Sequence, residues 1–286
     1  MAENNTARIA REVLAAREGG TPVLVATVIA APTAGAARVG AKLLVRRDES
    51  ASGSLGLEPL DGAVLREAAD AFRRHGVETL YLSVSGERLT RQQAEGTDAY
   101  QVMIEVHERP ASLLVVGGGH VGKALAELGA MCGFLVTVVD DRPEYANAER
   151  FPAAERVLCG RFDEVLADYP ADENTYAVCV TRGHRHDEIS LRAVVGKPAA
   201  YIGMIGSKRR VGAVLQHLVE TGVDPQAAAR VHTPIGLDIG AETPEEIAVA
   251  IMAEIIQVRR GGSGRPMKET RPGHKGVAPP ERLGDD

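Results

Sequence analysis

The chain of 286 residues contains no tryptophan, and aromatic residues make up only 3% of it. Proteins that bind single-stranded nucleic acid stack bases on aromatic side chains, so this scarcity argues against that class. A nucleic-acid or anionic-membrane surface also needs an excess of Lys and Arg, whereas the formal net charge here is -6. We therefore expect no nucleic-acid partner.

Cysteine is equally scarce, and Cys132, Cys159 and Cys179 are the three thiols, none in a C-x-x-C spacing. An odd, sparse set in apolar surroundings predicts buried free thiols in a reducing compartment, without a Cys-based zinc site. No run approaches 18 uninterrupted apolar residues, and residues 1–11 lack the apolar core of a signal peptide. We expect a cytoplasmic protein without a membrane span.

Short apolar segments between polar ones are abundant, and their pattern changes near residue 110. Before that point, strand-like segments are residues 23–30, 42–46, 78–84 and 100–107. Helical spacing is found in residues 6–17 and 61–75, with Asp61 as a plausible N-cap. These elements predict a small N-terminal α/β domain over residues 1–109.

After residue 110, continuous apolar strands alternate with helices, which indicates a parallel sheet covered on both faces. The predicted strands are residues 112–116, 135–139, 156–158, 176–181 and 199–205. The predicted helices are residues 120–132, 163–168, 187–195, 207–221 and 244–259. We predict an α/β fold whose C-terminal domain, residues 110–260, is Rossmann-like, followed by a disordered tail over residues 261–286.

A glycine-rich loop follows the first strand of the second domain. Gly117, Gly119 and Gly122 form a G-x-G-x-x-G pattern between a strand and a helix, the context that this motif requires. The first glycine makes a tight turn, the second admits a pyrophosphate, the third allows close helix packing, and the helix N-terminus adds partial positive charge. We expect a phosphate-bearing ligand here, with His120 among its contacts; the alternative is a Rossmann fold that binds no nucleotide.

The second strand leads to a pair of carboxylates. Asp140 lies 18 residues after Gly122, where a carboxylate would accept hydrogen bonds from the ribose of NAD. Asp141 and Arg142 follow, and Arg142 could instead contact the 2′-phosphate of NADP. The sequence therefore predicts ligand contacts at Asp140, Asp141 and Arg142, and leaves both dinucleotides open.

A polar loop, Thr181-Arg-Gly-His-Arg-His-Asp187, follows a later strand at the edge where open α/β sheets bind ligands. His184, His186 and Asp187 have the chemistry of metal ligands, but no further ligand is near in sequence, and Asp187 is equally suited to cap the next helix. We therefore predict no metal site and a ligand-contact loop in which Arg182 and His184 donate hydrogen bonds.

The following strand ends in a second glycine-containing loop with a cluster of cations. Gly206 loosens the backbone, Ser207 can cap the next helix, and Lys208, Arg209 and Arg210 occupy its first turn. Cations at a helix N-terminus oppose the macrodipole, and a bound phosphate would account for them. We include Gly206 to Arg209 in the predicted site; the alternative is a solvated basic helix surface.

Four segments of the second domain together resemble one family. They read GGGHVGKALAELGAMCGFLVTVVDDRPEYANAERFP, TRGHRHD, PAAYIGMIGSKRR and PIGLDIGAETPEEIAVAIMAEI. Residues 112–260 resemble the XdhC/CoxI family of accessory factors for molybdenum hydroxylases such as xanthine dehydrogenase and carbon monoxide dehydrogenase. The resemblance implies binding of molybdenum cofactor (molybdopterin), its sulfuration together with a cysteine desulfurase, and its delivery to the apo-enzyme. A homo-oligomer is also expected.

The N-terminal half resembles this family less closely. Arg38, Gly40 and Lys42 stand where the family pattern has them, but Pro59 stands where the family has Cys. A second family Cys has no counterpart near Gly96. A thiol is the natural soft ligand for molybdenum or carrier of sulfur, so the resemblance implies cofactor binding while the sulfuration step lacks its thiol.

We therefore predict a maturation factor for molybdenum hydroxylases, and whether it is itself an enzyme stays open. One alternative is an NAD(P)-dependent oxidoreductase acting on a small substrate, although no Tyr-x-x-x-Lys spacing supports it and His184 stands alone. The other alternative is a non-catalytic cofactor- or nucleotide-binding module, which the missing thiols favour.

Overall fold

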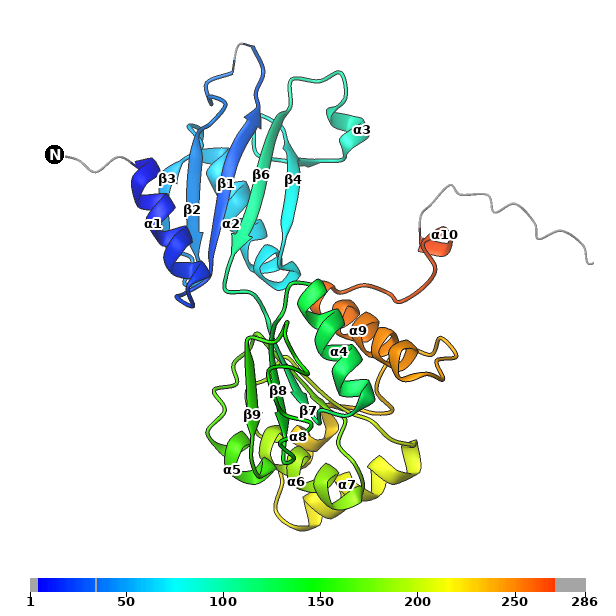
Figure 1. The fold of residues 1–286 in the computed structure, drawn as a ribbon. Helices are drawn as coiled ribbons and strands as arrows, with labels where there is room; N and C mark the ends of the chain where they lie inside the picture. The colour runs from blue at the N-terminus through cyan, green and yellow to red at the C-terminus, as the bar shows by residue number, and fades with distance from the viewer. Residues whose placement is uncertain (1–4, 34, 271–286) are drawn as a thin grey trace, which may run out of the picture.

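A computed structural model of the chain describes residues 5–33 and 35–270. These residues form two six-stranded sheets, one above the other in Figure 1, connected between β6 (Tyr100–His107) and β7 (Ser112–Val116). The tail predicted to be disordered lies outside the described residues from residue 271 onward. Residues 261–269 are exposed, and the short helix α10 (Met267–Thr270) lies at the end of the described part.

The first sheet is antiparallel, with the strand order β3-β2-β1-β6-β4-β5. Besides β6, its strands are β1 (Val23–Ala30), β2 (Lys42–Arg46), β3 (Ala51–Ser54), β4 (Val77–Leu82) and β5 (Arg88–Leu89). The strands predicted at 23–30, 42–46 and 100–107 are confirmed. The sequence analysis missed β3 and β5, because short edge strands with exposed, polar or small residues lack a hydrophobic period.

Two helices cover opposite faces of this sheet. Strand β1 alternates between them: Leu24 and Ala26 pack in the cluster beneath α2 (Glu58–Arg74), and Val23 and Val25 face α1 (Asn5–Arg17). A third helix, α3 (Arg91–Ala94), lies near the far end of the sheet. Both faces of β1 are therefore buried over Val23–Val28, whereas β6 is fully buried on one face only.

The predicted N-cap role of Asp61 is wrong, because α2 begins three residues earlier, at Glu58. The Asp61 carboxylate instead accepts hydrogen bonds from the Ser54 hydroxyl at 2.7 Å and the Leu55 backbone N–H at 2.7 Å. Pro59 occupies the first turn of the helix, where a missing N–H costs nothing. The carboxylate thus holds the connection between β3 and α2.

The second sheet is parallel throughout, with the order β9-β8-β7-β10-β11-β12. Besides β7, its strands are β8 (Leu135–Asp140), β9 (Arg156–Cys159), β10 (Thr175–Cys179), β11 (Tyr201–Met204) and β12 (Val231–His232). Counted within this domain, the order is third, second, first, fourth, fifth, sixth, which is the Rossmann arrangement. The predicted α/β class and the Rossmann-like C-terminal part are confirmed.

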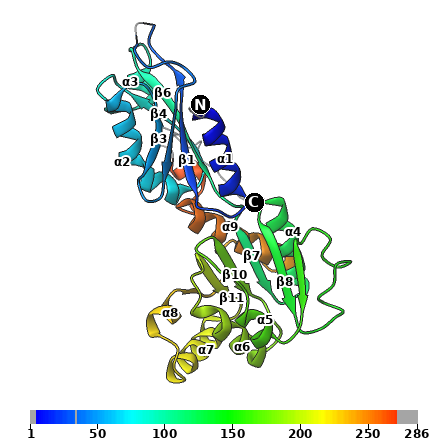
Figure 2. The ribbon, with the colours of Figure 1, turned by 90° about the vertical axis from the view of Figure 1, so that its left-hand side faces the viewer.

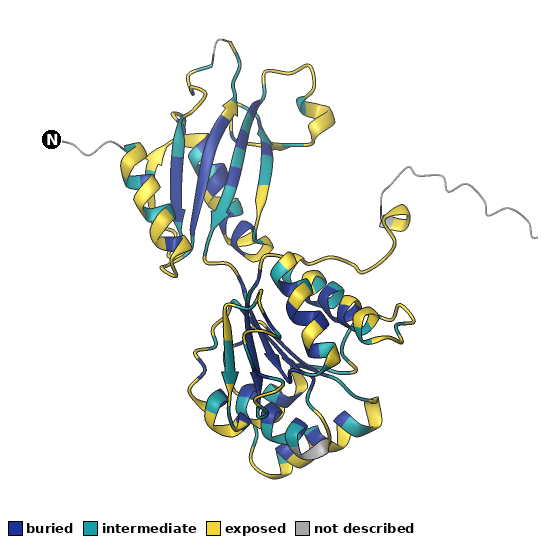
Figure 3. Cartoon of the chain, viewed as in Figure 1, coloured by how far each residue is buried: buried dark blue, intermediate teal, exposed yellow. Residues whose placement is uncertain are grey.

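Helices cover both faces of this sheet, as Figures 1 and 2 show. One face carries α4 (His120–Met131) and α9 (Pro244–Arg260), and the other carries α5 (Phe162–Ala167), α6 (His184–Val195) and α7 (Lys208–Glu220). A short helix, α8 (Pro225–Ala229), precedes the edge strand β12. Successive residues of β7 alternate between the two cores. Figure 3 shows the central strands buried, the edge strand β9 partly exposed and the outer helix faces exposed.

Side-chain capping accounts for the starts of α7, α8 and α9 in this domain. Ser207 caps α7 by accepting from the Arg210 N–H, and Thr243 and Glu246 form a complete capping box at α9 with Pro244 in the first turn. The suggested cap at Asp187 is wrong, because α6 begins three residues earlier with Gly183 as its N-cap. No helix in the described part of the chain is long and apolar enough to cross a membrane.

Candidate functional site

The candidate site lies at the carboxyl edge of the parallel sheet, between β7 and β10. The chain leaves β7 into α4 on one face and leaves β10 into α6 on the opposite face, which makes this the topological switch point of the sheet. Because all six strands are parallel, the loops after β7, β8, β10 and β11 reach this same edge. Each predicted site residue belongs to one of these loops, to the strand end before it or to the helix start after it. These residues are Gly117, Gly119, His120, Gly122, Asp140, Asp141, Arg142, Arg182, His184, Gly206, Ser207, Lys208 and Arg209.

The three glycines of the loop have different roles. Gly117 has φ +116°, and a Cβ on it would lie 2.6 Å from the Val180 carbonyl oxygen. A Cβ on Gly122 would lie 1.9 Å from the Gly117 carbonyl oxygen. Gly119 has φ -65°, and its Cβ would meet no atom within 4 Å. Gly117 and Gly122 therefore serve the fold, whereas Gly119 borders open space.

Gly119 is also the N-cap of α4 and provides no side-chain hydrogen bond to the first turn. The backbone N–H groups at a helix start need partners from outside the helix, and together with the macrodipole they attract anions. His120 is the first residue of α4 and is exposed. An open helix start at a switch point is the geometry that binds phosphate groups in this fold class.

Asp140 anchors this loop from the neighbouring strand. Its side chain is only 2% exposed; one carboxylate oxygen accepts from the Gly118 N–H at 2.8 Å, and the other accepts from Arg142 Nε at 2.9 Å. Burial opposes its ionisation, but the hydrogen bonds from Arg142 and Gly118 outweigh burial and hold the pKa of Asp140 below its ordinary value. The Asp140 carboxylate, which was predicted to accept hydrogen bonds from a ribose, therefore already accepts them from groups of the protein itself.

The segment between β8 and β9 packs over the glycine loop, which the sequence analysis did not anticipate. The Arg142 guanidinium lies 3.6 Å from the centre of the Tyr145 ring, and Arg150 Nε donates to the Gly118 carbonyl oxygen at 3.0 Å. Arg150 is 32 residues from Gly118 in sequence. A single arginine in a polar loop has no periodicity that would reveal such a contact.

An ion pair with a buried carboxylate lies at the opposite wall of the crevice. Asp187 is fully buried, accepts a hydrogen bond from the Thr181 hydroxyl at 2.5 Å and pairs with Arg210 at the start of α7. Arg182 is about half exposed, with its guanidinium 3.5 Å from Asp141, which comes from the loop after β8. Asp187 is thus held by partners on two sides, one of them the partly exposed Arg210, and Arg182 remains close to solvent.

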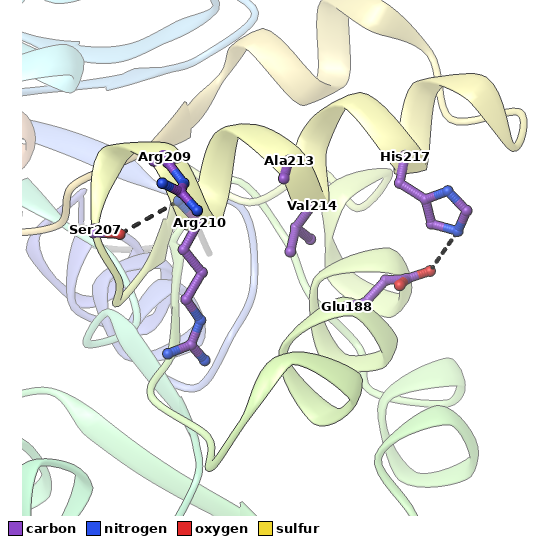
Figure 4. A pocket seen from close by; sticks show the side chains of 7 residues that line it. All are labelled: Glu188, Ser207, Arg209, Arg210, Ala213, Val214 and His217. Carbon is purple, nitrogen blue, oxygen red and sulfur yellow. Dashed lines mark hydrogen bonds and ion pairs between the residues drawn. The ribbon is translucent and has the colours of Figure 1, made fainter.

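The basic start of α7 borders a separate groove. Ser207, Arg209 and Arg210 line it together with Glu188 and His217, and its volume is about 870 Å³ (Figure 4). All its lining residues belong to α6 or α7 or cap α7, so the groove runs between these helices rather than over the glycine loop. Lys208 is exposed. Within the described residues, no group of three or more His, Cys, Asp or Glu side chains could hold a metal ion.

The prediction of three buried thiols is wrong for two of them. Cys132 is exposed at the C-cap of α4, and Cys159 is exposed at the end of β9, an edge strand. Apolar neighbours in sequence misled the prediction, because neither a helix end nor a sheet edge is covered. Cys179, in the central strand β10, is fully buried, and burial raises its pKa to about 12.

We therefore expect the native protein to react with Ellman's reagent at two thiols, and at the third only after unfolding. The reagent can reach the two exposed thiols, whereas it cannot reach the buried Cys179, whose raised pKa also disfavours the reactive thiolate. Cys132→Ser and Cys159→Ser should each remove one of the two thiols that react rapidly in the native protein, and Cys179→Ser should remove neither. A third fast equivalent in the native protein would contradict the burial of Cys179.

The strand order and the glycine loop at the switch point define a Rossmann-type domain. It follows an antiparallel α/β unit in the chain. Residues 113–255 match the family model described as the XdhC Rossmann domain. Residues 16–82 match the model described as the XdhC and CoxI family. The chain belongs to the XdhC and CoxI family, and the resemblance noted in the sequence is confirmed.

Two curated relatives are similar over large parts of the chain. The uncharacterized protein YqeB of Escherichia coli K12 is 32% identical over 246 residues, which cover 83% of this chain and 44% of that protein. A probable xanthine dehydrogenase subunit of Bacillus subtilis 168 is 34% identical over 159 residues, which cover 56% of this chain and 46% of that protein. The chain thus spans less than half the length of these relatives.

A solved structure shares the fold. The crystal structure of a xanthine dehydrogenase from Bacillus halodurans superposes with a TM-score of 0.51 at 18% identity. The superposition covers 92% of this chain and 98% of that one. Both parts of the chain therefore have a counterpart in an experimentally determined fold.

Proposed function

We propose that this protein is an accessory factor in the maturation of molybdenum hydroxylases of the xanthine dehydrogenase type, and that it binds molybdenum cofactor at the carboxyl edge of its Rossmann sheet. Family membership and the Bacillus subtilis relative described as a probable xanthine dehydrogenase component support the choice of client. The observation that carries the site is the open space at Gly119, beside the uncapped start of α4.

The residues of this crevice suit the phosphate of molybdopterin. The first-turn N–H groups of α4 would donate to the phosphate at Gly119, and Arg182, which makes only a 3.5 Å contact with Asp141, would reach it from the loop after β10. The cofactor, when bound, supplies the molybdenum centre that the client enzyme needs. The protein's own residues bind and orient it, and we assign no catalytic step to them.

The hydrogen bonds that Asp140 makes within the protein favour the pterin cofactor over NAD or NADP. Recognition of NAD needs a free carboxylate at this strand end for the ribose, and recognition of NADP needs a free cation nearby. Asp140 and Arg142 instead bind each other, and Asp140 also binds Gly118. A dinucleotide would have to break these buried hydrogen bonds, whereas a phosphate at the helix start would not.

We further propose that the partners are the apo-hydroxylase and a cysteine desulfurase, in the cytoplasm, and that no thiol of the N-terminal domain carries the sulfur. Position 59 holds an exposed proline in the first turn of α2. The chain would therefore hold the cofactor during sulfuration and release it to the client. The division into domains at residues 109 and 110 is part of this proposal, and a homo-oligomer stays a prediction.

A Gly119→Val variant tests the proposal. The valine side chain would occupy the open space at the helix start, so binding of molybdopterin, measured by calorimetry, should weaken by at least about a hundredfold. The melting temperature should stay within about 2 °C of the wild type, because a Cβ at this position meets no atom within 4 Å.

Gly196→Val is the matched control. A Cβ added at Gly196 would also meet no atom within 4 Å, and Gly196 is the C-cap of α6, at the end of the helix remote from the crevice. It should bind like the wild type. NADH and NADPH, titrated in parallel, should bind more weakly than molybdopterin. Equal binding of molybdopterin by wild type and Gly119→Val, or no binding by the wild type, would contradict the proposed site.

A further inference from the structure

The C-terminal end of α9 lies near the connection between the two sheets (Figures 1 and 2). A basic hollow is lined by residues from this end of α9 and from the connection. We call it the junction hollow; its volume is about 420 Å³. Its lining contains four arginines and a single carboxylate, that of Glu108. The arginines are Arg17, Arg109, Arg259 and Arg260. Such a surplus of positive charge stands out in a chain whose formal net charge is -6.

These cations come from distant parts of the chain. Arg17 ends α1, Arg109 follows β6 in the connection between the sheets, and Arg259 and Arg260 end α9. Both domains therefore contribute charge to one place. The C-terminal ends of two helices favour cations, but they do not by themselves require four of them to line one hollow.

Glu108 neutralises only part of this charge. Its carboxylate lies 2.7 Å from His75 Nδ1 and 3.7 Å from Arg259 Nη2. The Arg259 side chain is 13% exposed, and its buried Nε has no hydrogen-bond partner among the described residues. Partial burial of the guanidinium, and then the neighbouring charge of Arg259, lower the pKa of Arg260.

An adjacent hollow of about 300 Å³ provides a contrast, since it shares His75, Glu108 and Arg109 with the junction hollow. There, Asp172 and Glu173 add two carboxylates, and Arg47 pairs with Glu173 at 3.1 Å. Carboxylates outnumber arginines in that lining. The surplus of cations is thus a property of the junction hollow and not of the whole contact region.

We propose that the junction hollow binds a phosphate group, as a diphosphate or a phosphate ester, and that the bound anion bridges the two domains. Guanidinium groups bind phosphate oxygens through paired, charge-assisted hydrogen bonds, and four of them line this hollow. The site is separate from the glycine loop, because Arg109 precedes β7 at the amino edge of the parallel sheet. It therefore does not depend on the proposed function.

Calorimetry of the full chain with inorganic pyrophosphate at low ionic strength tests this site. The Gly119→Val background removes the glycine loop as a competing phosphate site. In that background, Arg17→Gln and Arg260→Gln should each weaken binding about tenfold, because each removes one charged donor from a different domain. Both side chains are exposed, so neither change threatens folding.

Two further variants make the test specific. Arg265→Gln removes the same charge from the exposed segment after α9 and should leave binding unchanged. Glu108→Gln removes the one carboxylate and should tighten binding several-fold. Glycerol 3-phosphate, titrated in parallel, shows whether a phosphate ester or a diphosphate is preferred. No pyrophosphate binding in the Gly119→Val background, or equal affinity in Arg17→Gln, Arg260→Gln and Arg265→Gln, would overturn the proposal.

Discussion

Replacing Gly122 by alanine should destabilise the Rossmann domain by about 3 kcal/mol, although only one methyl group is added. The added Cβ would lie 1.9 Å from the Gly117 carbonyl oxygen, far inside the contact distance of the two atoms. That carbonyl belongs to the backbone of the tight loop and cannot rotate away as a flexible side chain would. Helix α4 would therefore have to move off strand β7, which would open the core between them.

Thermal unfolding followed by circular dichroism measures this effect. A loss of about 3 kcal/mol corresponds to a fall of roughly 6–12 °C in the melting temperature of a domain of this size. Gly119→Ala is the control within the same motif, because a Cβ there meets no atom within 4 Å. If Gly122→Ala melted at the same temperature as Gly119→Ala, the close packing of α4 on the glycine loop would be refuted.

The second large effect is expected from Asp187→Ala. Asp187 is fully buried and joins the loop after β10 to the first turn of α7 through Thr181 and Arg210. Removing the carboxylate leaves the Thr181 hydroxyl and the Arg210 guanidinium, whose side chain is 29% exposed, without their acceptor, which should cost about 2–3 kcal/mol. We expect a clear fall in the melting temperature and in the denaturant midpoint.

Two companion variants identify the cause. Asp163→Ala breaks an exposed ion pair with Arg161 and should leave the melting temperature unchanged. Asp187→Ala combined with Arg210→Met removes both charges and should recover part of the lost stability, because no unpaired guanidinium remains. A melting temperature for Asp187→Ala equal to that of Asp163→Ala would show that the pair does not stabilise the wall of the crevice.

Local signals predicted the parts of the fold that depend on neighbouring residues. The continuous apolar segment at residues 112–116 is the central strand β7, and the box formed by Thr243 and Glu246 begins α9. The spacing of Gly117, Gly119 and Gly122 placed a strand-to-helix turn where the structure has one. Each of these features depends on residues within one turn or one strand, so the order of residues along the chain was sufficient to predict it.

By itself, then, the sequence determined the α/β class, the Rossmann-like second half, the glycine loop and the family. Only the tertiary structure decided that Asp140 binds Gly118 and Arg142, that Cys132 and Cys159 are exposed, and that arginines from α1 and α9 share one hollow. The physical reason is common to all three. Partners and burial depend on which segments pack together across the fold, and the spacing of residues along the chain does not encode those contacts.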